Sequence, residues 1–333
     1  MQTTHSVLSA SNLSIGYHSG NNAVTVMQDI NLQLHSGRLT AMLGRNGIGK
    51  STLLRTIAGA QPSLNGTVLL DGRNINEYSP RELSRQMSLV YTDRTQAGGL
   101  TVKQLVSLGR YPHTGFFGRL GRHDHDVVAQ SMTAAGIKHK ETEYVAELSD
   151  GERQKAMIAR ALAQETPIIL LDEPTSFLDV ASRIEVMMLL HQLARNEHKA
   201  VLLSTHDITQ ALSLADELWV MAHNHTILQG CTEDCILSGA IQEMFPHNVH
   251  DGITFDPAIG DFEITLQATH GYSLHCSNST LHRWIANALR RNGIATSGNE
   301  GTITANSPTD ITLSTQNTTT HFTSIAALLD AIR

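Results

Sequence analysis

The stretch Gly44-Arg45-Asn46-Gly47-Ile48-Gly49-Lys50-Ser51-Thr52 decides the fold of this chain. It lies between an apolar run, Leu39 to Leu43, and a helical pattern that starts at Leu53. A glycine-rich loop between a buried strand and a helix predicts a phosphate-binding turn, because backbone N–H groups can crowd around an anion at the positive end of the helix dipole. We expect Lys50 to reach the outer phosphates and Ser51 to offer its hydroxyl to Mg²⁺.

Composition narrows the class of protein. A chain of 333 residues with 41% hydrophobic content suits two domains, or one large α/β domain with an appendage. A formal charge of −7 argues against nucleic acid as a partner, since nucleic-acid binders usually carry a basic face. Three cysteines are too few for a disulfide framework, and the first twenty residues lack a basic start and an apolar block, so we expect the cytoplasm. No apolar run approaches the ~20 residues of a membrane span.

Two further apolar runs are predicted to be buried strands with polar ends. The first, Pro167 to Leu171, ends in Asp172-Glu173, and the second, Ala200 to Ser204, ends in Thr205-His206. Parallel strands present their ligands at the carboxyl edge of a sheet. We therefore expect Asp172 to hold Mg²⁺ and Glu173 to polarise a water against a γ-phosphate. A histidine after a strand is often structural, but two strand ends aimed at one loop favour a γ-phosphate contact for His206.

The rest of the first 240 residues supplies a setting for these strands. Short apolar runs from Val7 to Leu34 predict antiparallel strands, and Tyr17 at the end of one could stack on a base or simply pack. The pattern is helical from Leu100 to Gln164, with an aromatic loop at 110–118 whose rings either fold under the loop or face a partner. The run His123 to Asp126 is predicted to be a helix start rather than a metal site, because residues two apart on a helix do not share a face.

Taken together, these motifs resemble the ATP-binding cassette ATPases over roughly residues 7 to 240. The signature of that family appears as Leu148-Ser149-Asp150-Gly151-Glu152, in which Ser149 and Glu152 also fit a helix capping box. Ser176-Phe177-Leu178-Asp179 is similar to the loop that crosses the dimer interface, His206 to the switch histidine, and Tyr17 to the adenine-stacking residue. The resemblance implies an α/β cassette with a RecA-like core, an antiparallel β subdomain and a helical subdomain.

The family relationship would also assign the site. Two copies would pair head to tail, so that each ATP is held by the phosphate loop of one copy and the signature of the other. Glu173 and His206 would be catalytic, and Ser51, Asp172 and Thr92 would hold Mg²⁺. Nucleotide contacts would come from Tyr17, Gly44, Asn46, Gly47, Gly49, Lys50, Ser51, Thr52, Ser149, Gly151, Glu152 and Asp179.

Two departures from the family pattern change what we expect. Thr92 stands where the family commonly has Gln; a threonine hydroxyl can hold the metal through water, so we expect altered coupling rather than lost activity. The signature carries Asp150 and Glu152 where Gly and Gln are usual. Carboxylates that pointed at a triphosphate would repel it, so we expect both to serve the helix start or to face solvent.

The segment from Leu105 to Leu120 resembles the ATPase subunits of bacterial importers for iron chelates, haem and cobalamin. That likeness implies an integral membrane permease, a substrate-binding protein as an indirect partner, and a place on the cytoplasmic face of the membrane. A soluble, non-transport cassette acting in translation or DNA repair is the alternative. Such proteins usually carry two cassettes or a long coiled-coil insertion, whereas this chain has one phosphate loop and no sustained heptads. An exporter subunit is a further alternative.

Beyond the cassette, predicted for residues 1–245 with its helical subdomain at about 96–165, we expect a small α+β domain at 250–333. One helical face runs from Leu281 to Leu289 and stops at Gly293, and a second helix covers Ile325 to Ile332. Strands are expected around 262–266, 272–276, 302–305 and 311–314, and a four-stranded sheet would cover both helices. A regulatory ligand site, a dimer contact and a structural cap remain open as its role.

Overall fold

The computed structural model describes residues 6–19, 22–91, 99–245, 253–264, 268 and 270–332. The chain divides into two compact units, Met1–Pro246 and His247–Arg333. Within the described ranges, every helix is too short or too polar to cross a bilayer. The predicted metal ligand Thr92, with its neighbours Asp93 and Gln96, lies outside the described residues.

A six-stranded sheet forms the centre of the first unit, in the order β10-β9-β3-β8-β7-β6. The five strands from β9 to β6 are parallel, and β10 pairs antiparallel with β9. Strands buried on both faces must be apolar throughout, which explains the continuous hydrophobic runs in the sequence. The strands are β3 (Leu39–Leu43), β6 (Met87–Val90), β7 (Ile168–Asp172), β8 (Ala200–Thr205), β9 (Glu217–Met221) and β10 (Ile227–Cys231).

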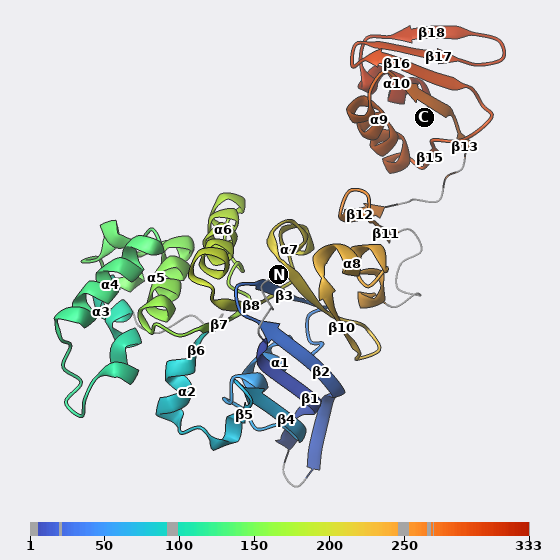
Figure 1. Ribbon diagram of the computed structural model, residues 1–333. Helices are drawn as coiled ribbons and strands as arrows, with labels where there is room; N and C mark the ends of the chain where they lie inside the picture. Colours follow the sequence, from blue (N-terminus) through green and yellow to red (C-terminus); the bar gives the residue numbers. More distant parts are fainter. Residues whose placement is uncertain are drawn as a thin grey trace. The chain divides into compact units, whose positions relative to one another are not determined.

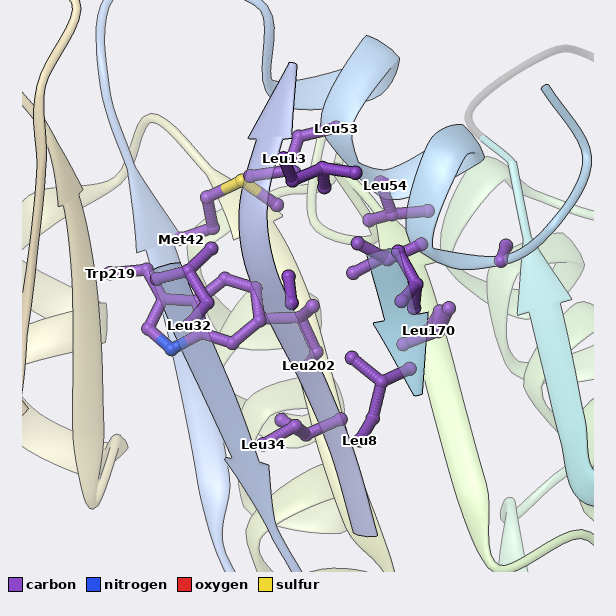
Figure 2. Packing of buried hydrophobic residues seen from close by; sticks show 14 of the residues in the cluster. Leu8, Leu13, Leu32, Leu34, Met42, Leu53, Leu54, Leu170, Leu202 and Trp219 are labelled. Carbon is purple, nitrogen blue, oxygen red and sulfur yellow. The ribbon is translucent and has the colours of Figure 1, made fainter. Parts of the chain in front are cut away.

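An antiparallel sheet in the order β2-β1-β4-β5 covers one side of this core, and β1 and β2 are the antiparallel strands predicted before the phosphate loop. Side chains from both sheets and from the helix after the loop meet in one apolar cluster, in which Leu13, Met42 and Leu53 pack together with Trp219 (Figure 2). The phosphate loop therefore starts from a rigid base. The elements are β1 (Ser6–Ser19), β2 (Asn22–His35), β4 (Asn65–Leu70), β5 (Arg73–Asn74) and helix α1 (Lys50–Ile57).

Helices α3, α4 and α5 gather into a separate group beside the central sheet (Figure 1). Helix α4 begins at Arg122, and Asp124 accepts a hydrogen bond from the Gly121 N–H, which confirms a helix start at the His123 run. The helices are α2 (Pro80–Gln86), α3 (Val102–Ser107), α4 (Arg122–Ala134), α5 (Asp150–Ala163), α6 (Val180–Glu197), α7 (Ile208–Leu214) and α8 (Thr232–Leu237), with 3₁₀ segments at Ile75–Glu77, Leu108–His113, Lys138–Lys140, Val145–Glu147 and Gln242–Met244.

The second unit packs two helices on a four-stranded sheet in the order β14-β16-β17-β18. The predicted strand around Phe262 belongs instead to a separate hairpin of β11 and β12. The fourth strand of the sheet is β18, an edge strand that is mostly exposed and lacks the apolar alternation that predicts strands. The elements are β11 (Ile253–Asp256), β12 (Asp261–Ile264), β13 (His270–Gly271), β14 (Ser273–Cys276), α9 (Ser279–Arg291), β15 (Ile294–Ala295), β16 (Thr302–Ser307), β17 (Asp310–Ser314), β18 (Thr319–Phe322) and α10 (Ile325–Ile332).

Candidate nucleotide-binding site

The phosphate loop joins the buried end of β3 to the first turn of α1. Gly47 and Gly49 adopt positive φ angles of 81° and 117°, which side chains rarely tolerate. A Cβ at Gly49 would lie 2.6 Å from Val26 Cγ1, so the loop also presses against β2. Gly49 is the N-cap of α1 and has no side chain to occupy the first-turn N–H groups of that helix. Those donors, at Lys50, Ser51 and Thr52, can therefore meet an anion.

Lys50 is a buried cation of this loop, whereas Arg45 is exposed. Its side chain is 5% exposed, and Nζ donates to the backbone oxygens of Gly44 at 2.8 Å and Arg45 at 3.2 Å. Burial lowers the pKa of this ammonium group, and the nearby carboxylates of Glu173 and Asp172 oppose that shift. The positive charge is thus held where solvent screens it little, which strengthens its attraction for a polyphosphate.

Asp172 and Glu173 end β7 beside the carboxyl end of β8. Ser204 on β8 stands opposite Asp172, donates through Oγ to Asp172 Oδ1 at 2.7 Å, and accepts from the Glu173 N–H at 2.9 Å. The Glu173 N–H also donates to the Ser204 carbonyl at 3.1 Å. Glu173 has a φ of 46°, in the left-handed region that is costly for residues with a side chain. The network around Ser204 holds this strained turn.

The Glu173 carboxylate faces three other functional side chains. Oε2 accepts from Ser176 Oγ at 2.8 Å and lies 3.6 Å from His206 Nδ1, while Oε1 lies 3.9 Å from Lys50 Nζ. The predicted phosphate-binding lysine, water-polarising carboxylate and γ-phosphate histidine are therefore brought together at one edge of the sheet. Asp172 is buried and supplies the hard oxygen that Mg²⁺ prefers, so it fits the predicted metal role together with Ser51 in the first turn of α1.

Tyr17 lies on β1 and is not packed into the core. Its side chain is 54% exposed on β1, two residues after the buried Ile15. A Cβ at Gly49 would lie 3.8 Å from the side chain of Ile15, so this part of β1 borders the phosphate loop. An exposed ring of this kind can stack on a base, so the predicted stacking role of Tyr17 stays a prediction.

The signature residues organise the start of α5. Ser149 Oγ accepts from the Glu152 N–H at 3.3 Å, and Glu152 Oε2 accepts from the Ser149 N–H at 2.9 Å, which is the predicted capping box. The hydrogen bond from the Ser149 N–H lowers the pKa of Glu152, with a smaller contribution from Lys140. Asp150 pairs with Arg153 at 2.9 Å. Both acidic departures from the family pattern therefore serve the helix start and have cationic neighbours.

Asp179 caps the next helix and lies close to the signature. It accepts from the Ser182 N–H at 2.8 Å at the start of α6, and this hydrogen bond lowers the pKa of its carboxyl group. A Cβ at Gly151 would lie 3.0 Å from Ser182 Oγ, so the first turns of α5 and α6 are in direct contact. Arg183 donates to the Leu178 carbonyl at 2.8 Å and pairs with Asp207 at 3.4 Å.

Sequence reasoning missed two polar side chains that build this site. Ser204 is fully buried and bonds the Asp172 carboxylate and the Glu173 N–H, and Ser176 donates to the Glu173 carboxylate. A signal for Ser204 existed, since a serine that ends an otherwise apolar strand needs a hydrogen-bond partner. The role of Arg183 could not have been found, because its ion-pair partner Asp207 lies 24 positions later in the chain.

Comparison with known proteins identifies the family. Residues 27–176 match the family model described as ABC transporter, and residues 273–333 match the one described as iron ABC transporter C-terminal domain. An uncharacterized ABC transporter ATP-binding protein of Methanocaldococcus jannaschii is 38% identical over 78% of this chain and 87% of its own length. The ferric enterobactin transport ATP-binding protein FepC of Escherichia coli is 37% identical over 70% of this chain and 84% of its own.

A solved structure supports the same family assignment. The dimeric structure of a bacterial ABC transporter cassette superposes with a TM-score of 0.57 and 26% identity, covering 64% of this chain and 93% of that one. The P-loop site, the two carboxylates at the end of β7 and the signature helix are the parts that an ATPase of this kind requires. The chain therefore belongs to the ABC transporter family, as an ATP-binding and ATP-hydrolysing subunit.

Proposed function

We propose that this ATPase energises the uptake of a metal chelate, such as a ferric siderophore, haem or cobalamin, through a separate membrane permease. Two observations support the choice of cargo: the match of residues 273–333 to an iron transporter domain, and the E. coli relative whose name refers to ferric enterobactin. The chain would lie on the cytoplasmic face of the membrane and act with a substrate-binding protein through the permease. We propose residues 1–245 as the cassette, 96–165 as its helical subdomain, and 250–333 as the C-terminal domain.

The catalytic assignments follow from the cluster around Glu173, which is the observation that carries the proposal. Glu173 would orient the attacking water, His206 would contact the γ-phosphate, and Lys50 would neutralise the outer phosphates. Mg²⁺ would be held by Ser51 and Asp172, with Thr92 as a further ligand. The metal would supply charge stabilisation to the transferring phosphoryl group. Tyr17 would stack on the adenine.

The remaining nucleotide contacts would come from a second copy. The similar cassette whose structure is solved is dimeric, and we propose the same for this chain. In such a pair, Ser149, Gly151 and Glu152 would face the γ-phosphate held by the partner's loop, and Asp179 would cross the interface. Closure would depend on contacts that ADP cannot make, so ATP binding would close the pair and hydrolysis would reopen it.

An exposed aromatic surface on the helical group supports a permease partner. Tyr111, Phe116 and Phe117 are 70%, 98% and 82% exposed, so the alternative in which these rings fold under their loop is wrong. Exposed apolar side chains that cluster in this way mark interaction sites. A cavity of about 410 Å³ also opens between the end of α1, α2 and β6, where Tyr78 and Leu83 form part of an apolar wall. Short apolar helices of a permease would fit the surface that the exposed rings and this cavity provide.

Co-purification tests this function. The tagged chain would be recovered from detergent-solubilised membranes of its source, and the proposal predicts a partner with many membrane-spanning helices. Replacing Phe116 and Phe117 with Ser should abolish that recovery and leave ATP binding unchanged. Leu237→Ser is the matched control, because Leu237 is 81% exposed on α8, away from the aromatic loop. Recovery with ribosomes or DNA, independent of the phenylalanines, would instead support a non-transport cassette.

A further inference from the structure

The motif Leu108-Gly109-Arg110-Tyr111-Pro112-His113 has no part in the nucleotide chemistry described above. It forms a 3₁₀ segment that includes the start of the aromatic loop at 110–118, whose exposed rings are Tyr111, Phe116 and Phe117. A Cβ at Gly109 would lie 2.2 Å from the Arg160 carbonyl oxygen and 3.0 Å from Ala163 Cβ. The backbone of this segment therefore lies directly against the last turn of α5, at a distance that only glycine permits.

Arg110 fastens the segment at that point. Its side chain is only 2% exposed, although it carries a permanent charge. Nη1 donates to the Ala163 carbonyl at 2.7 Å and to Glu165 Oε2 at 2.6 Å, and Nε donates to Asp124 Oδ1 at 2.9 Å. One guanidinium group thus joins the loop to the end of α5 and to the first turn of α4. A cation at the end of a helix also satisfies a carbonyl that has no partner within the helix.

The neighbouring residues hold the same loop from two sides. His113 Nε2 lies 2.9 Å from the Gln164 carbonyl, directly after α5. Arg81 and Arg85 on α2 donate to the Pro112 carbonyl at 3.2 Å and 3.0 Å. Because both faces of the segment are bonded, the start of the aromatic loop cannot move without moving α2 or the end of α5.

Helix α5 connects this anchor to the nucleotide site. It is 14 residues long, with the signature residue Ser149 capping its first turn and Ala163 in its last. At about 1.5 Å per residue the helix spans roughly 21 Å as a stiff rod. A displacement of Ala163 is therefore expected to move Ser149 as well.

We propose that Arg110 is a positioning residue that couples the exposed aromatic loop to the signature turn through α5. A partner bound to Tyr111, Phe116 and Phe117 would in this way set the position of Ser149, and nucleotide held at Ser149 would set the position of the loop. The identity of that partner as a permease rests on the proposed function. The mechanical link between the aromatic loop and α5 does not depend on the proposed function.

Hydrogen–deuterium exchange tests the link without a permease. The parent protein and all variants carry Glu173→Gln, and amide exchange is compared in the presence and absence of MgATP. The test variant combines Arg110→Met with Asp124→Asn and Glu165→Gln, so that no carboxylate loses its cation. The matched control carries Asp124→Asn and Glu165→Gln alone and keeps the bond from Arg110 to the Ala163 carbonyl.

The proposal predicts that MgATP slows exchange at residues 108–113 in the parent and in the control but not in the test variant. Exchange at residues 149–153 should slow in all three. Slowing at residues 108–113 in the test variant, or its loss in the control, would overturn the role of Arg110. If the triple variant does not fold, Arg110→Lys replaces it. A lysine can reach one acceptor but not all three, so a reduced response is expected and an unchanged one would count against the proposal.

A second measurement uses the complex recovered from membranes. For this measurement Arg110→Met, Asp124→Asn and Glu165→Gln are introduced with Glu173 intact. Stimulation of ATP hydrolysis by the permease should then fall roughly 2- to 30-fold, the range that mutations between coupled sites produce. The unstimulated rate and the KM for ATP should not change, whereas a general loss of structure would alter both. If no permease is recovered, the proposed function fails on its own, and the exchange experiment still decides the role of Arg110.

Discussion

Replacing Ser204 with Ala removes the hydroxyl group that joins the Asp172 carboxylate to the backbone of Glu173. In the native structure Ser204 Oγ donates to Asp172 Oδ1 at 2.7 Å and accepts from the Glu173 N–H at 2.9 Å, and the residue is fully buried. The bond to the carboxylate contributes about 1.5–3 kcal/mol, as is usual for hydrogen bonds to charged groups. The Glu173 N–H keeps the Ser204 carbonyl at 3.1 Å, so its contribution to the loss is small. We expect the free energy of unfolding to fall by about 1.5–3 kcal/mol.

Ser88→Ala is the matched control. Ser88 is also a buried serine on the central sheet. Its hydroxyl accepts from Thr166 Oγ1 at 3.1 Å and donates to the Ile168 carbonyl at the long distance of 3.5 Å. These partners are neutral, so the expected loss is about 0.5–1.5 kcal/mol. Because Ser204 also positions Asp172 and Glu173, which we propose as the metal ligand and the water-orienting carboxylate, its removal should slow ATP hydrolysis about 10- to 100-fold, whereas Ser88→Ala should leave the rate unchanged.

Urea unfolding followed by tryptophan fluorescence measures the stability of the cassette. The chain has two tryptophans, of which Trp219 is buried in the cassette and Trp284 is exposed in the second unit, so the experiment uses a Trp284→Phe background. Turnover is measured as phosphate release at saturating MgATP. Equal destabilisation by the two serine variants, with both at the parent rate, would refute the assignment of Ser204 as the residue that holds this turn.

Three further predictions concern the same unit. Glu173→Gln should stop turnover and leave an ATP-bound dimer, seen by size-exclusion chromatography with MgATP; turnover near the parent rate would remove Glu173 from the mechanism. Gly49→Ala should weaken nucleotide binding in a fluorescence titration far more than Gly47→Ala, because only the Gly49 Cβ meets a neighbour within 4 Å. Burial raises the pKa of Cys235 from 9.0 to about 11, so folding favours the protonated thiol and stability should fall from pH 9 to 11. In Cys235→Ala the free energy of unfolding should fall less between pH 9 and 11, as measured by urea unfolding. The same fall in the variant and the parent would contradict this role of Cys235.

The sequence was sufficient for the parts of the fold that depend on local patterns. The phosphate loop, the buried strand that ends in Asp172 and the capping box at Ser149 each follow from residues adjacent in the chain, and all three are present. Strand β18 could not be predicted in the same way, since an exposed edge strand of Thr and His carries no apolar periodicity.

Contacts between distant segments were also beyond reach. Arg110 bonds residues 53 and 55 positions later in the chain, and Ser204 bonds Asp172 from 32 positions away. Which strand lies beside which, and which helix end meets which loop, depends on the packing of the whole domain rather than on local preference. The candidate site was therefore predicted as a set of residues, while the side chains that hold those residues in place came only from the structure.

The most direct test of the account is the structure of the Glu173→Gln variant with MgATP, by crystallography or cryo-electron microscopy. We predict two copies head to tail, with each γ-phosphate contacted by Lys50 of one copy and by the turn at Ser149 of the other. A nucleotide-loaded structure in which Ser149 lies away from every phosphate of a second copy would contradict it.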